Sequence, residues 1–147
     1  QFKFNFRHPA ISRDESKVLL DHAFRLDFER NGPSLYRLMR TMMVRWQRYR
    51  SDADARVRGR VGVSAAQLRA GWGAALWAME RYLRAGNPGV SERIRSLRLD
   101  TEREFGAMTS AINRVAGPAL LWSSKRDARR HPTGRTLEPR TFVERHA

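Results

Sequence analysis

The sequence predicts an all-α protein: a bundle of four to five helices with a short N-terminal extended segment and a mobile C-terminal tail. Apolar residues recur at steps of three and four, the spacing that places them on one face of a helix. Gly and Pro residues divide the chain into segments of helical length. The hydrophobic fraction of 41% exceeds that of disordered chains, so the 147 residues should form one core.

Residues 1–10 are predicted to be an extended lead-in. Phe2, Phe4 and Phe6 alternate with polar residues, as in a half-buried strand. A single strand cannot satisfy its own backbone hydrogen bonds, so it would have to pair with another molecule or with a further part of this protein. Because the chain also starts with Gln1 rather than Met, we expect it to be a fragment of a longer protein.

A helical domain is predicted over residues 11–130. Ser12 and Glu15 have the spacing of a capping box, so the first helix should begin there. Gly32 and Pro33 should end this helix and start the next. The expected inward face of the first helix consists of Val18, Leu19, Ala23, Leu26 and Phe28.

The second helix should begin at Pro33 or Ser34 and pack through one apolar stripe. The stripe consists of Leu35, Leu38, Met39, Met42, Trp46 and Tyr49, with most Arg residues off it. Residues 51–62 are polar and contain two Gly, which predicts a linker with a short helical turn at 54–58.

The third helix is predicted from Ser64, as N-cap, through Ala85. Within it, Gly71 and Gly73 are either sites of close approach by a helix or ligand, or small residues that the helix tolerates.

The fourth helix should start at Ser91 and run about 26 residues, until Gly117 and Pro118 kink or break it. A last helical piece at 119–130 and a flexible tail at 131–147 complete the chain. The expected seam of the fourth helix is Ile94, Leu97, Thr101, Phe105, Met108, Ile112 and Val115.

No residues in the sequence form a convincing catalytic or metal-binding constellation. The chain has no Cys, which excludes thiolate nucleophiles and Cys-ligated metals within it. The four His have no metal-ligand spacing, and His22 is interpreted as a surface residue. Ser34, Ser51, Ser64 and Ser91 are explained as helix caps. We therefore assign no catalytic, cofactor-binding or metal-binding residue to this chain alone.

The net charge of +14 makes nucleic acid a possible partner, although the basic residues are spread along the chain rather than gathered in a tail. The longest uncharged runs are about half as long as a membrane span, so the sequence predicts no transmembrane segment and a cytoplasmic protein.

One region, residues 4–60, resembles a known family. The string Asp27-Phe-Glu-Arg-Asn-Gly-Pro-Ser-Leu-Tyr-Arg37 is its core, followed by Trp46, Tyr49-Arg50 and the cluster at 52–58. This pattern is similar to the region after the catalytic barrel in cobalamin-binding radical SAM proteins. The resemblance implies a parent enzyme with a [4Fe–4S] cluster, S-adenosylmethionine and cobalamin, in which this chain is a C-terminal helical region docked on the barrel. None of the family's catalytic motifs is present in the chain, so the implied role is structural or substrate-gating.

The candidate site is the corner between the first two helices, formed by Asn31, Gly32, Pro33, Ser34 and Arg37. It either lines a substrate path or serves as an inter-helix corner. Two other classes remain open: a stand-alone basic helical module that binds nucleic acid or acidic protein partners, and a membrane-surface protein. The second would use Trp72, Trp77 and Trp122.

Overall fold

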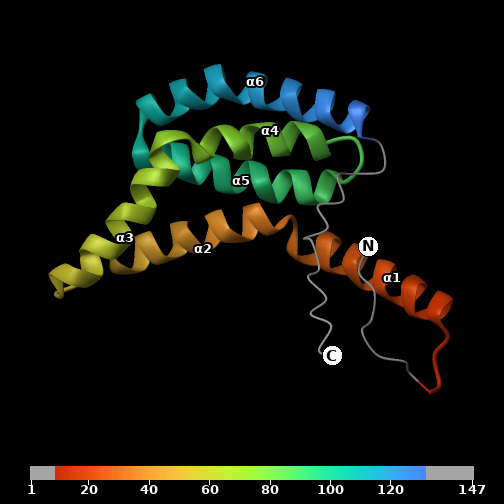
Figure 1. The fold of residues 1–147 in the computed structure, drawn as a ribbon. Coiled ribbons are helices and arrows are strands. Elements are labelled where there is room, and N and C mark those ends of the chain that lie inside the picture. The colour runs from red at the N-terminus through yellow and green to blue at the C-terminus, as the bar shows by residue number, and fades with distance from the viewer. Residues whose placement is uncertain (1–8, 132–147) are drawn as a thin grey trace, which may run out of the picture.

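The computed structural model describes residues 9–131, and every regular element in that range is a helix, which confirms the predicted all-α bundle (Figure 1). Most of the predicted lead-in, and the predicted tail beyond His131, lie outside the described residues. The elements are α1 (Arg13–Asn31), α2 (Ser34–Tyr49), α3 (Ala55–Gln67), a π-helical turn η1 (Leu68–Trp72), α4 (Gly73–Leu83), α5 (Pro88–Phe105) and α6 (Ala107–Arg130).

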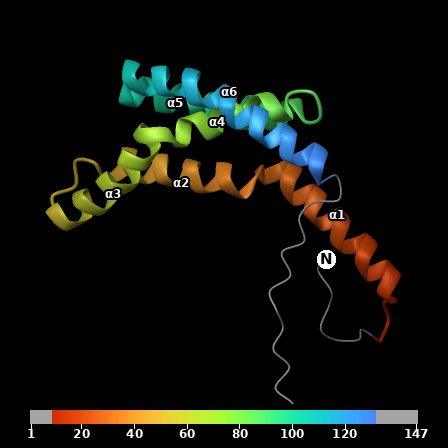
Figure 2. The ribbon, with the colours of Figure 1, turned by 45° about the horizontal axis from the view of Figure 1, so that its top comes forward.

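Helices α4, α5 and α6 pack side by side, and α2 lies against them, while α1 and α3 extend outward from the two ends of α2 (Figures 1 and 2). One hydrophobic core lies between α2, η1, α4 and α5, as predicted from the chain length. No helix in the described range has both the length and the apolar character needed to cross a bilayer. The core residues are Tyr36, Met39, Met42, Met43, Leu68, Leu76, Val90, Ile94 and Leu97.

The start of α1 is confirmed, and its predicted inward face is partly correct, because Leu26 is partly buried and Phe28 packs against the core while the rest of the face is exposed. Glu15 N–H donates to Ser12 Oγ at 3.2 Å, and Ser12 N–H donates to Glu15 Oε2 at 2.8 Å, which completes the capping box. Val18 and Leu19 are nevertheless 68% and 55% exposed. The reason is that α1 projects beyond the bundle and meets it mainly through α5.

The start of α2 at Ser34 is confirmed, and its stripe is partly correct. Met39 and Met42 are buried, whereas Leu35 and Leu38 are exposed. Tyr36 and Met43 are buried instead. Both α3 and α5 pack on α2, so the covered face is rotated from the one that the spacing of the apolar residues predicted.

The predicted linker at 51–62 is too long, because the helical turn predicted at 54–58 is the start of α3, which begins at Ala55. Asp54 caps it by accepting a hydrogen bond from Arg56 N–H at 2.8 Å. Ser64, the predicted cap of the third helix, lies inside α3. Burial of Val61 and Ala65 offsets the low helix propensity of the two Gly in this segment.

The turn η1 joins α3 to α4 with a bend between them, where the sequence predicted a single helix from Ser64 through Ala85. The kink lies at Gly71, whose φ of 166° and ψ of −15° are not helical, and Leu68 at the start of the turn lies in the core with no exposed area. The carbonyl of Arg69, within the turn, accepts a hydrogen bond from Thr109 Oγ1 of α6 at 3.4 Å.

The predicted cap and length of the fourth helix are wrong. Asn87, not Ser91, caps α5, accepting from Val90 N–H at 3.1 Å, and Pro88 occupies the first turn. Gly106, with φ +84°, ends α5 after Phe105. The seam predicted beyond this point is therefore broken, and Met108 and Val115 are 67% and 80% exposed.

The predicted break at Gly117-Pro118 is also wrong, because both residues lie inside α6. A Cβ on Gly117 would come within 2.6 Å of the Trp77 ring, and one on Gly73 within 2.4 Å of Asn113 Oδ1. Glycine at these two positions thus lets α4 and α6 pack closely. Of the two explanations for Gly73, close approach of a neighbouring helix is the correct one.

Candidate functional site

The predicted corner residues lie together at the junction of α1 and α2. The Asp27 carboxylate, at the end of α1, accepts hydrogen bonds from Asn31 Nδ2 at 2.7 Å and Arg37 Nη1 at 3.2 Å. Arg37 also pairs with the second Asp27 oxygen at 3.1 Å, and its Nη2 donates to Ser34 Oγ at 3.2 Å. The polar side chains of the corner thus bind one another.

Gly32 permits the corner because its φ of +74° lies in the region that favours glycine. Its N–H donates to Phe28 O at 2.8 Å and closes α1. A Cβ at this position would lie 2.9 Å from the Tyr36 ring. Pro33 follows, with φ −58°, and leads directly into Ser34.

Arg93 of α5 ties the corner to the bundle by donating from Nη2 to the carbonyl of Glu29 at 2.7 Å. The corner therefore holds α1 at a set angle to α2 and α5. It contains no nucleophile next to a base, and its one carboxylate is already paired with Arg37. Its chemistry suits positioning rather than proton transfer.

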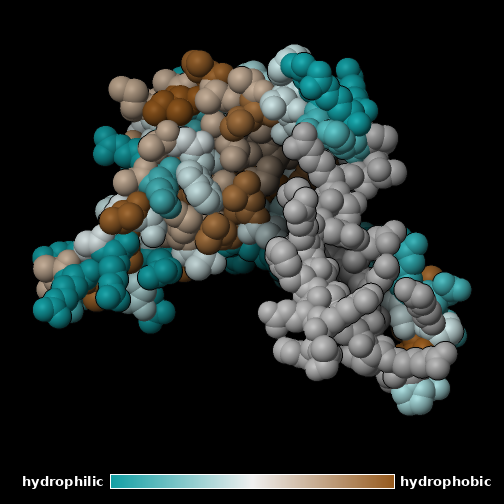
Figure 3. Space-filling model, viewed as in Figure 1, coloured by the Kyte–Doolittle hydropathy of each residue, from teal (hydrophilic) through white to brown (hydrophobic). Residues whose placement is uncertain are grey.

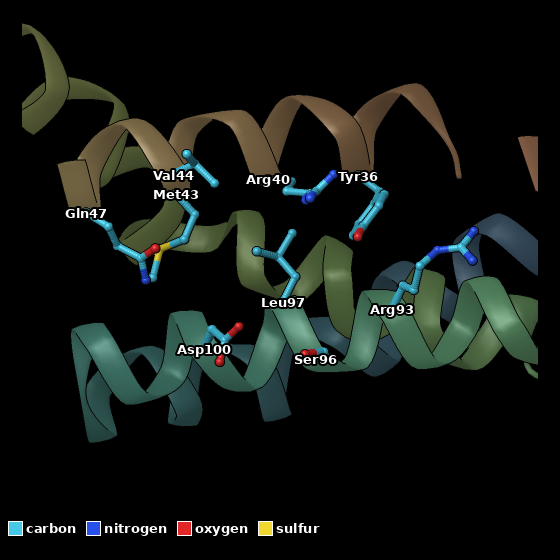
Figure 4. A pocket seen from close by; sticks show the side chains of 9 residues that line it. All are labelled: Tyr36, Arg40, Met43, Val44, Gln47, Arg93, Ser96, Leu97 and Asp100. Carbon is cyan, nitrogen blue, oxygen red and sulfur yellow. The ribbon is translucent and has the colours of Figure 1, made fainter. Parts of the chain in front are cut away.

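A groove of about 210 Å³ lies along the interface of α2 and α5 (Figure 4). Tyr36 and Arg40 point from α2 toward α5, and Leu97 points back from α5. No hydrogen bond or ion pair of the Arg40 guanidinium is found with the described residues. The full lining is Tyr36, Arg40, Met43, Val44, Gln47, Arg93, Ser96, Leu97 and Asp100.

The second polar cluster is buried between α4, α5 and α6 and centres on Glu80, which is 2% exposed. Its carboxylate accepts from Arg98 Nε at 2.8 Å and from Arg84 Nη2 at 3.1 Å. Arg98 also donates to Glu102 Oε1 at 2.8 Å, and Asn113 Nδ2 donates to the same oxygen at 3.1 Å. Glu80, Glu102 and Arg98 therefore compensate one another's charge in the interior, while Arg84, whose side chain is 64% exposed, pairs with Glu80 from the surface.

The pKa values of the two arginines nearest this cluster shift in opposite directions. Desolvation by itself would lower the pKa of Arg98, but the hydrogen bonds to Glu102 and Glu80 outweigh it and raise the pKa. For Arg81, desolvation dominates and lowers the pKa. Arg81 lies over the Trp77 ring, 3.5 Å from its centroid, where the aromatic face stabilises the cation.

The sequence interpretation missed the Glu80 cluster. Glu80–Arg84 and Arg98–Glu102 are each four residues apart, a spacing that marks side chains on one helix face and could have been noticed. The pairing of Glu80 with Arg98 joins α4 to α5 and has no signal in the sequence. A comparable pairing at the end of α2 joins Trp46 and Arg50 to Glu104.

The predicted surface histidine is exposed: His22 lies on α1 within 3.3 Å of Arg25. Among residues 9–131, no group of three or more His, Asp or Glu side chains is arranged to hold a metal ion. Of the three Trp considered for a membrane surface, Trp72 and Trp77 are partly buried and Trp122 is 63% exposed.

Comparison with known proteins adds no relative: no family model, curated protein or solved structure matches this chain.

Proposed function

We propose that this chain is the C-terminal helical region of a radical SAM, cobalamin-dependent iron–sulfur enzyme, in which it positions or gates the catalytic barrel. The residues that resemble the family support this, because they are the ones that organise the two ends of α2. At one end, Asp27 and Arg37 close the corner with α1. At the other, Asp54 caps α3, and Arg58 Nη1 donates to the carbonyl of Asp52 at 2.6 Å.

As a result of this arrangement, α1 is an arm that projects from the bundle. The corner holds α1, a helix of about 28 Å, away from the bundle of its own chain (Figures 1 and 2). Val18 and Leu19 are exposed on that arm, and apolar side chains on a projecting helix gain free energy when another surface covers them. In the proposed enzyme that surface belongs to the catalytic barrel, and we expect the enzyme to be cytoplasmic.

The cofactors of such an enzyme have to be bound elsewhere in the protein. The chain has no Cys, so it supplies no thiolate for a [4Fe–4S] cluster, and its described residues offer no metal-binding group. This chain would contribute to the shape of the enzyme's active site and to the access of substrate to it.

The first test is the coding sequence upstream of Gln1, where we expect a Cys-x-x-x-Cys-x-x-Cys motif and an Asp-x-His-x-x-Gly motif. A reading frame that encodes neither would refute the proposal. The second test uses the parent enzyme with a photo-crosslinking amino acid at Leu19, and at Val63 of α3 as a control that is at least as exposed. We expect position 19, and not position 63, to crosslink to barrel peptides.

A second candidate function is binding of a polyanion such as RNA or DNA. It is favoured by the exposed arginines of α2, because Arg45, Arg48 and, at the groove, Arg40 have no carboxylate partner among the described residues, whereas Arg37 is paired with Asp27. Binding should then weaken steeply with added salt, because phosphate-bound counterions are released. Absence of binding at about 0.15 M salt would eliminate this candidate.

A further inference from the structure

Helix α6 carries an apolar outer face that no other described helix covers, and within α6 only Arg126 lies over it, 5.1 Å from the centroid of the Trp122 ring. Met108, Val115 and Trp122 are 67%, 80% and 63% exposed. They are seven residues apart, close to two turns of helix, so they form one line along α6. In Figure 3 hydrophobic atoms gather along the upper edge of the molecule, where α6 lies, and hydrophilic atoms at its C-terminal end.

This face is the opposite of the one that packs on the bundle. The packed face consists of Thr109, Asn113 and Gly117, all buried and four residues apart. A helix at the surface of a bundle needs only one face for packing on the core, and its opposite, outer side is normally polar. The seven-residue spacing of the outer line is that of a seam between two paired helices.

We propose that this face is a dimer interface, in which α6 pairs antiparallel with α6 of a second copy of this chain. The proposal depends on α6 alone and is independent of the proposed enzymatic context.

The arrangement of side chains about Val115 supports a two-fold contact. Met108 lies seven residues before Val115 and Trp122 seven after, while Ala111 and Ala119 lie four residues to either side. In an antiparallel pair centred on Val115, Met108 packs on Trp122 of the partner subunit, and the alanines face each other. The largest side chain thus meets a flexible thioether, and the small residues allow close approach.

Charge selects the antiparallel orientation. Lys125, Arg126, Arg129 and Arg130 all lie at the C-terminal end of α6, with Asp127 as the only acidic residue there. A parallel pair would place two such cationic ends side by side. The antiparallel pair separates them by at least the length of the apolar line, about 21 Å, well beyond the Debye length of about 8 Å.

The size of the face predicts a reversible dimer. Covering the three exposed side chains and the adjacent alanines on both copies would bury on the order of 1,000 Å², near the lower limit for a specific interface. Association should therefore depend on concentration in the micromolar range.

The first experiment measures the mass of the 147-residue chain in solution by sedimentation velocity over a concentration series. We expect a shift from monomer to dimer for the native chain. Val115→Glu should abolish the shift, because it places two carboxylates face to face on the axis. Val63→Glu, at a similarly exposed position on α3, should leave it unchanged, and circular dichroism shows whether each variant keeps its helices.

The second experiment determines orientation and exploits the absence of Cys from the native chain. With a short bismaleimide crosslinker, Val115→Cys should yield a covalent dimer, whereas Met108→Cys and Trp122→Cys should do so only when the two variants are mixed. Crosslinking of Met108→Cys alone would indicate a parallel pair and overturn the proposal. So would a native chain that stays monomeric, including one that binds anionic vesicles through the α6 face instead.

Discussion

Replacing Gly73 by Ala tests the close packing of α4 against α6. The added Cβ would lie 2.4 Å from Asn113 Oδ1, 2.5 Å from Nδ2 and 2.8 Å from Cγ. Asn113 has no exposed area, and its Nδ2 is bonded to Glu102. The side chain therefore cannot move away without losing this hydrogen bond.

The expected cost follows from two opposing effects. Overpacking a rigid, buried site costs about 3 kcal/mol. Replacing Gly by Ala in a helix recovers at most about 1 kcal/mol. We therefore expect the free energy of unfolding to fall by about 2 kcal/mol, which corresponds to a Tm lower by roughly 6 to 8 °C for a domain of this size.

The assay is urea unfolding followed by circular dichroism at 222 nm, with Gly62→Ala as the matched control. Gly62 also lies in a helix, but a Cβ there meets nothing within 4 Å, so this variant should be as stable as the native chain or slightly more stable. The double variant Gly73→Ala/Asn113→Ala should recover part of the loss, because the clash is removed. The reasoning is refuted if Gly73→Ala is as stable as Gly62→Ala.

Three further perturbations test other parts of the fold. Glu80→Gln should lower the free energy of unfolding by about 3 kcal/mol, because Arg98 loses the more deeply buried of its two carboxylate partners and keeps only Glu102; an unchanged urea midpoint would contradict this. Gly32→Ala should cost about 2 kcal/mol in the same assay, since φ of +74° strains any other residue, and a native-like Tm would show that the corner relaxes. The pKa of Glu15 in the folded chain is lowered by its hydrogen bonds with the backbone and side chain of Ser12. These bonds therefore stabilise α1 fully at a pH above the pKa of Glu15 in the unfolded chain, and the stabilisation is lost as the pH falls through the pKa of Glu15 in the folded chain. NMR titration of Glu15 in Ser12→Ala should show a smaller lowering of its pKa, because the side-chain hydrogen bond is lost while the backbone N–H of residue 12 still donates to the carboxylate; an identical titration in both proteins would exclude the Ser12 side chain as a cause.

Helix ends that depend on neighbouring residues were predictable from the sequence. The capping box at Ser12 and the corner at Gly32 require only side chains and backbone within about four residues, so their patterns carry the full information. Asp54 and Asn87 have equally local capping roles, but Ser64 and Ser91 match the same capping pattern in the sequence. Since Ser, Asp and Asn are nearly equivalent as caps, composition cannot choose among candidates a few residues apart.

The corner and the Glu80 cluster differ in how far apart in the sequence their bonded residues lie. Every hydrogen bond among Asp27, Asn31, Ser34 and Arg37 joins residues at most ten positions apart, and the sequence located this corner. The Glu80 cluster joins positions 18 residues apart on α4 and α5, and Asn113 joins it from α6. Such pairs exist only once the helices have packed, so the sequence offered no indication of the complete cluster.

The sequence by itself determined that this chain is helical, where α1 ends and α2 begins, and which residues form the corner between them. The tertiary structure decided which apolar faces are covered. Gly117 and Gly106 both lie in a helical pattern of the sequence. In the structure Gly117 packs against Trp77 inside a continuous α6, whereas Gly106 separates α5 from α6. The physical reason is that helical periodicity reports only that a face is apolar, whereas its burial depends on a neighbour that the periodicity does not specify. The outer line of Met108, Val115 and Trp122 continues a predicted packing seam, and within the described chain it has no such neighbour.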